Sequence, residues 1–158
     1  MQRRSFLQRI GLAAAATAAT ATLTPQSLLA AEAPKGPNTM DIDTALKAIT
    51  GGKAVTPSKK VHLKAPEIAE NGAVVPVTIE VDSPMTNDDY VKAIHVFATK
   101  NSNVRCADIM LTPANGAAMF ATRIKLGSSQ DVLVVAETST GEFLSAKQSV
   151  KVTIGGCG

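Results

Sequence analysis

Residues 75–81 read Val-Pro-Val-Thr-Ile-Glu-Val, an alternation of apolar and mostly polar positions. Successive side chains of a β-strand point to opposite faces, so this pattern predicts a strand that is buried on one face. Pro76 has no N–H to donate, which predicts an edge or a bulge on its side of the strand. The stretch therefore indicates a β-sheet protein with one packed face.

The same period of two recurs on both sides of this stretch, and turn-forming segments such as 101–103 and 127–129 separate the repeats. The expected strands cover residues 61–65, 75–81, 92–99, 104–111, 119–126, 132–137 and 143–154. The strand at 132–137 is almost wholly apolar and is expected to be central. About seven short strands without intervening helices predict an all-β, antiparallel sandwich over residues 60–154.

Residues 32–59 are expected to form a linker and one short helix. The apolar residues of this helix fall at helical spacing and make one stripe: Ile42, Ala45, Leu46 and Ile49. Asn38 or Thr39 can cap its start, and Gly51-Gly52 ends it. An amphipathic helix of this kind is expected to lie against the outside of the sandwich.

The first 31 residues have the layout of an export signal. Arg3-Arg4 precede Ser-Phe-Leu, a charge-free and Ala-rich stretch follows, and small residues occur at Ala30 and Ala31. The paired arginines predict a twin-arginine leader that directs the protein to the periplasm, with cleavage near Ala30 or Ala31. After cleavage no association with a membrane is expected.

The leader also accounts for the charge of the chain. The full sequence has 16 Lys and Arg against 13 Asp and Glu, a net charge of +3. Three of the arginines are in the leader, so residues 32–158 have 13 groups of each sign. This balance gives no support to nucleic-acid binding.

The two cysteines occupy different surroundings. Cys106 lies within an expected strand and is predicted to be a small buried core residue. Cys157 stands between Gly155-Gly156 and Gly158, beyond the last strand, where glycine gives the backbone its widest freedom. We interpret residues 155–158 as a flexible arm and Cys157 as a covalent attachment point. Two alternatives stay open: a thiol–disulfide protein that pairs Cys106 with Cys157, or a β-sandwich interaction module with an incidental tail.

Other kinds of chemistry find little support. His62 and His95 each stand alone in a strand, and neither a metal-ligand spacing nor a phosphate-binding glycine loop is present. Cys157 has no general base among its neighbours along the sequence, so it is expected to be a poor catalyst. We therefore predict no catalytic residue, no metal and no cofactor.

Four stretches of the sequence resemble one known family. They are residues 71–77, 83–86, 90–95 and 152–158, the last of which ends Ile-Gly-Gly-Cys-Gly. They resemble SoxY, the sulfur-carrier subunit of the bacterial thiosulfate-oxidising (Sox) system. The resemblance covers nearly all of the chain after the leader.

This resemblance implies an immunoglobulin-like sandwich and a heterodimer with a SoxZ-like carrier subunit. It implies that Cys157 carries sulfur covalently and that the chain is not itself an enzyme. The partners implied are a c-type cytochrome enzyme that couples thiosulfate to the thiol, a hydrolase that releases sulfate, and a sulfane dehydrogenase. A homodimer linked through two Cys157 residues is a further expectation, because two mobile thiols meet easily.

Overall fold

The computed structural model describes residues 39–156, which form one α-helix, nine strands and one 3₁₀ helix. The helices are α1 (Ile42–Thr50) and η1 (Pro113–Asn115). The strands are β1 (Val55–Pro57), β2 (Val61–Lys64), β3 (Ile68–Asn71), β4 (Val75–Val81), β5 (Val91–Ala98), β6 (Arg105–Met110), β7 (Ala118–Ile124), β8 (Gln130–Thr138) and β9 (Phe143–Ile154).

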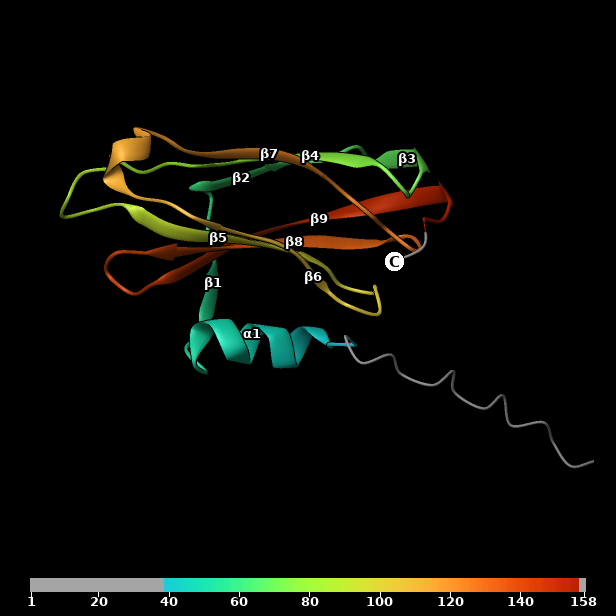
Figure 1. Cartoon of the computed structure of the whole chain (residues 1–158), viewed down its shortest axis with the longest axis horizontal. Helices are drawn as coiled ribbons and strands as arrows, with labels where there is room; N and C mark the ends of the chain where they lie inside the picture. The colour runs from blue at the N-terminus through green and yellow to red at the C-terminus, as the bar shows by residue number, and fades with distance from the viewer. Residues whose placement is uncertain (1–38, 157–158) are drawn as a thin grey trace, which may run out of the picture. The chain divides into compact units, whose positions relative to one another are not determined.

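The strands form two stacked sheets (Figure 1). The larger sheet has the order β1-β9-β8-β5-β6, with β3 also paired to β9, and the smaller sheet has the order β2-β4-β7. All pairings are antiparallel except those of β1 and β3 with β9. The predicted immunoglobulin-like sandwich is confirmed, and β8 occupies the predicted central position between β5 and β9.

The main core lies between the two sheets. On β4 the residues Val75, Val77 and Ile79 are fully buried, as the alternation predicts. They belong to one cluster with inward-facing residues of the larger sheet, including Val96 and Val134. Each such side chain contributes about 1.5–3 kcal/mol through its removal from water. The prediction for Pro76 also holds, since β2 pairs only with residues 78–81 of β4 and Pro76 lies beyond its end.

Helix α1 covers the outer face of the larger sheet (Figure 1). Ala45 is fully buried in a second apolar cluster with Phe97 and Val135, which is why β5 is buried on both faces. The expected cap was wrong: Asp41 caps the helix, and its carboxylate accepts a 2.8 Å hydrogen bond from the backbone N–H of Thr44. No helix among residues 39–156 is long and apolar enough to cross a membrane.

Two strands, β1 and β3, were not predicted. Strand β1 lies within the segment expected to be linker, and it joins the larger sheet beside β9. Both strands are short and run parallel to a partner that lies far away in the sequence. Such pairing depends on the position of β9 in space and leaves no signal in a local alternation pattern.

Candidate functional site

Strand β9 leads the chain to the predicted attachment site. It pairs with β8 as far as Val150, and its last residues then pair with β3 as far as Ile154. Gly155 and Gly156 follow directly and are described, whereas Cys157 and Gly158 lie outside the described residues. The surroundings of the predicted site are thus defined up to the residue before the thiol.

The two glycines lie against two turns of the sandwich. The N–H of Gly156 donates a 3.0 Å hydrogen bond to the carbonyl oxygen of Leu126. The N–H of Leu126 in turn donates to the carbonyl of Gly72 at 2.7 Å, and the N–H of Gly72 donates to the carbonyl of Ile154 at 2.7 Å. We call the residues that receive the glycines, namely Gly72, Ala73, Leu126 and Gly127, the arm cradle.

Close approach of backbones explains why glycine is needed here. A Cβ atom on Gly156 would lie 2.6 Å from the nitrogen of Ala73 and 2.7 Å from the carbonyl carbon of Gly72. A Cβ on Gly155 would collide with the carbonyl oxygen of Gly127. Both obstacles are backbone atoms that cannot rotate away. The diglycine therefore fits the cradle because it has no side chains. The conformational freedom of glycine would not by itself allow this close contact.

The contacts of the cradle with the arm are chemically inert. All the hydrogen bonds that hold Gly156 and Gly72 in place join backbone groups, and Gly72, Ala73, Leu126 and Gly127 have no titratable side chain. The cradle can position the chain next to Cys157, but none of its own side chains can remove a proton from a thiol. The flexibility of residues 155–158 stays a prediction.

Cys106 is the other thiol. It is a free cysteine, packs as a half-buried side chain against the main core, and directs its sulfur toward the carbonyl of Val104 at 3.7 Å. Burial raises the pKa of the Cys106 thiol, so its reactive thiolate form is disfavoured. Cys106 is thus less buried than predicted, although it does pack against the main core, and its raised pKa gives no support to a redox pair with Cys157.

The two histidines lie in different sheets, His62 on β2 and His95 on β5. His62 is exposed and lies 3.0 Å from Asp82. His95 is buried, and its Nδ1 lies 2.6 Å from Asp108, which also accepts a 2.7 Å hydrogen bond from Arg105. No group of three or more potential metal ligands occurs in the part of the chain that the structure describes.

The carboxylate of Asp108 is stabilised in its charged form. Burial raises its pKa, but hydrogen bonds from His95 and Arg105 lower the pKa by more, and the net direction is downward. The contacts among His95, Asp108 and Arg105 join β5 to β6, which is an edge strand of the larger sheet.

None of the four residues of the arm cradle is predicted from the sequence, and the reason is clearest for Gly72. The Asn-Gly pair predicts a turn over Glu70-Asn71-Gly72. Glu70 and Asn71 instead belong to β3, and the turn begins only at Gly72. Its second role, contact with the diglycine, arises only when the turn and the chain end meet in space. The one signal in the sequence was the glycine itself, which occurs in many turns for local reasons.

Comparison with known proteins adds an identification. The family profile described as "Sulfur oxidation protein SoxY" matches residues 46–157. The chain belongs to the SoxY family. The match extends through the described sandwich and includes the position of Cys157. No curated protein matches the chain.

A solved structure agrees with this assignment. The sulfur carrier protein SoxY from Chlorobium limicola f thiosulfatophilum superposes with a TM-score of 0.62 and 31% identity, over 72% of this chain and 97% of that one. A putative superoxide reductase from Thermotoga maritima has a TM-score of 0.52 at 17% identity, over 62% and 93% of the two chains, and shares the fold alone. Membership of the SoxY family and the likeness to the Chlorobium protein support a role as a sulfur carrier in the Sox system.

Proposed function

We propose that this protein is the periplasmic sulfur carrier of a thiosulfate-oxidising system and that Cys157 is the point of covalent attachment. The protein performs no turnover by itself and presents its cargo to partner enzymes. Family membership supports the carrier role, and the twin-arginine layout of residues 1–31 supports the location.

The observation that supports the proposal is the inert anchor of Gly156, the residue that precedes Cys157 in the sequence. Cys157 is the next residue after Gly156, which is held at the end of the sandwich by hydrogen bonds between backbone groups. A nucleophilic cysteine enzyme needs a positioned base or cation beside the sulfur. In the cradle no side chain can serve as that base, so activation is left to the partner enzymes.

The proposed cycle conserves atoms and charge at each step. The Cys157 thiol and thiosulfate join to give Cys–S–S–SO₃⁻, and one proton and two electrons leave, the electrons passing to a c-type cytochrome partner. Water then cleaves the terminal S–S bond, which releases sulfate and one proton and leaves Cys–S–SH. The remaining sulfur leaves by one of two routes. Another sulfur acceptor takes it as zero-valent sulfur, which restores Cys–SH directly, or a sulfane dehydrogenase oxidises Cys–S–SH with three waters to Cys–S–SO₃⁻, and seven protons and six electrons leave. A second hydrolysis then releases sulfate and one proton and restores Cys–SH. Each step changes only the atoms attached to Cys157.

The proposed assembly is a heterodimer with a SoxZ-like subunit. The three enzymes of the cycle would visit this heterodimer in turn, because one thiol can be serviced by only one active site at a time. A disulfide between two Cys157 residues would block the thiol, and we propose it as an inactive storage form.

The test compares Cys157→Ser with the matched control Cys106→Ser. Wild-type protein and each variant are incubated with thiosulfate and the partner enzymes, and the peptides are then analysed by mass spectrometry. With the coupling cytochrome alone we expect one S₂O₃ group on the Cys157 peptide of the wild type and of Cys106→Ser, and with all partner enzymes we expect full thiosulfate oxidation. Cys157→Ser should neither load nor support oxidation. Oxidation that persists in Cys157→Ser would refute the proposal.

A further inference from the structure

A pocket of about 420 Å³ lies beside the arm cradle. It opens between the start of β6, which contributes Arg105 and Cys106, and the end of β7, which contributes Arg123 and the adjoining Lys125. Asn101, from the turn between β5 and β6, completes this part of the wall. We call the whole pocket the cationic pocket. None of the residues that line it is a carboxylate.

The charge of the cationic pocket is only partly compensated. Arg105 donates to Asp108 at 2.7 Å, which neutralises one of the three cations. Arg123 and Lys125 are exposed and have no ion-pair partner among residues 39–156. The pocket thus offers two cations that are free to bind an anion, and a guanidinium group presents paired donors suited to an oxyanion.

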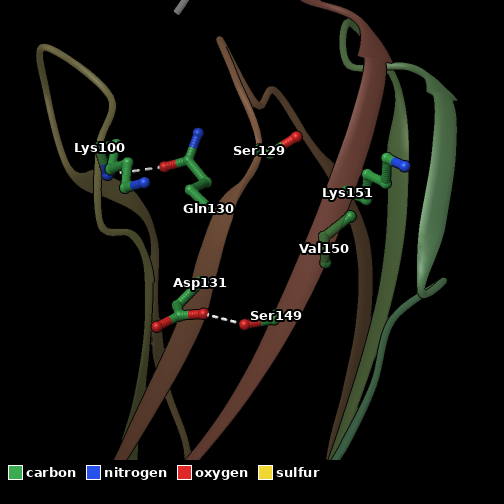
Figure 2. Close-up of a pocket in the computed structure, with 7 residues that line it drawn as sticks. All are labelled: Lys100, Ser129, Gln130, Asp131, Ser149, Val150 and Lys151. Carbon is green, nitrogen blue, oxygen red and sulfur yellow. Dashed lines mark hydrogen bonds between the residues drawn. The ribbon is translucent and has the colours of Figure 1, made fainter.

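A second pocket, of about 270 Å³, provides the contrast. It contains Lys100 and Lys151, but Asp131 also lines it (Figure 2). Asp131 accepts a hydrogen bond from the Ser149 hydroxyl and lies 3.4 Å from the Nζ atom of Lys147. A carboxylate in this position repels an anion and pairs with nearby cations. This pocket is therefore a poorer anion site than the cationic pocket.

One backbone segment joins the cationic pocket to the cradle. Asn101 donates through Nδ2 to the carbonyl of Lys125 at 2.8 Å and accepts through Oδ1 from the N–H of Gly127 at 3.0 Å. Between these two residues lies Leu126, whose carbonyl holds Gly156. Cys157 follows Gly156 directly, and consecutive Cα atoms are about 3.8 Å apart. A group attached to Cys157 therefore starts close to the pocket whenever the diglycine occupies the cradle.

We propose that the cationic pocket binds the anionic end of the cargo on Cys157, a sulfonate or thiosulfonate oxyanion, through Arg123 and Lys125. This inference rests on the proposed carrier function and adds a subsite to it. An oxyanion gains charge-assisted hydrogen bonds there, whereas an uncharged adduct of the same size gains none. The docked arm thereby distinguishes cargo by charge.

Thiol–disulfide exchange tests the proposal without any partner enzyme. The Cys157 thiolate attacks a symmetrical disulfide RS–SR, forms Cys–S–S–R and releases RS⁻, so no external oxidant or reductant is needed. The two reagents are the disulfides of 2-mercaptoethanesulfonate, which is anionic, and of 2-mercaptoethanol, which is neutral. Mass spectrometry of the Cys157 peptide after acid quenching gives the equilibrium constant for each, and their ratio is the sulfonate preference.

Two double variants remove the same amount of charge from different places. Arg123→Gln/Lys125→Gln empties the cationic pocket, and Lys100→Gln/Lys151→Gln alters the pocket of Figure 2. We expect the first to lower the sulfonate preference roughly fivefold, as the loss of a surface ion pair would, and high salt to weaken the wild-type preference. The second should leave the preference at the wild-type value.

Either of two results would overturn the inference. One is an unchanged preference in Arg123→Gln/Lys125→Gln, and the other is an equal loss in both double variants, which would indicate only the overall charge of the protein. All four side chains are on the surface, and thermal unfolding checks that the variants are folded. These results would not contradict the carrier function, because that function is tested separately by the loading of Cys157 in the thiosulfate assay.

Discussion

Replacement of Gly72 by alanine is the sharpest test of the arm cradle. A Cβ atom at this position would lie 2.8 Å from the nitrogen of Gly156 and 2.9 Å from Cγ1 of Val152, and closer still to the carbonyl oxygen of Leu126. Since the nearest atoms belong to the backbone, the turn after β3 and the start of the arm must separate to make room.

The expected cost follows from the hydrogen bonds that converge on this contact. Three bonds are at risk: Gly72 to Ile154, Leu126 to Gly72 and Gly156 to Leu126. At about 1 kcal/mol for each, their loss costs roughly 3 kcal/mol. Alanine also restricts the unfolded chain, which returns about 0.4–1 kcal/mol. The net loss of stability toward global unfolding should be about 2 kcal/mol. Of the three bonds, only the one from Gly156 joins the arm to the cradle, so the equilibrium between docked and undocked arm should shift by about 1 kcal/mol, a factor of roughly 5.

Hydrogen–deuterium exchange measures this opening directly. In Gly72→Ala, the amides of the peptide that ends at the arm should exchange about fivefold faster than in the wild type, and urea unfolding should report a loss of about 2 kcal/mol. Gly116→Ala is the control, because its Cβ would meet nothing within 4 Å and its cost comes only from a φ of +72°. Arm exchange that is as slow in Gly72→Ala as in the wild type would refute the reasoning.

Three further predictions concern the sandwich itself. Phe97→Ala removes a fully buried ring beneath α1 and should lower the free energy of unfolding by about 3–5 kcal/mol in urea; a loss below 1 kcal/mol would contradict its core role. Burial raises the pKa of Asp108, but hydrogen bonds from His95 and Arg105 depress it overall, so its stabilising contribution is present above about pH 4 and is lost as the pH falls through the depressed folded-state pKa. Asp108→Asn should therefore cost about 1 kcal/mol at pH 7, after allowance for partial exposure, and unfolding curves at pH 2–7 should show a weaker loss of stability toward acid than in the wild type. Cys106, whose pKa is raised by burial, should react with iodoacetamide at pH 8 about tenfold more slowly in the folded protein than in urea, and equal rates would show that the thiol is not protected.

Local sequence patterns predict most of the fold. The alternation at residues 75–81 and its repeats located the principal strands, and the stripe that includes Ala45 located the helix and its buried face. These features depend on which face of a single element is apolar, and that is visible within a window of seven to ten residues. The N-cap at Asp41 is not predicted because several polar residues precede the helix and each of them could cap it. The backbone angles of these residues decide which one does.

The C-terminal motif likewise indicates Cys157 as the candidate attachment point, and together with three other stretches it resembles SoxY. It could not reveal the cradle or the cationic pocket. The contact of Gly156 with Gly72 joins residues 84 positions apart, and Arg105 and Arg123 line one pocket from strands of different sheets.

The sequence by itself thus determined the principal strands and the helix and indicated Cys157 as the candidate attachment point, because each is encoded by neighbouring residues. The tertiary structure alone decided the parallel pairing of β1 and β3 with β9, the docking of the diglycine, and the cations beside it. Those arrangements depend on how the sheets stack and on where β9 ends, so they exist only once distant segments have come together.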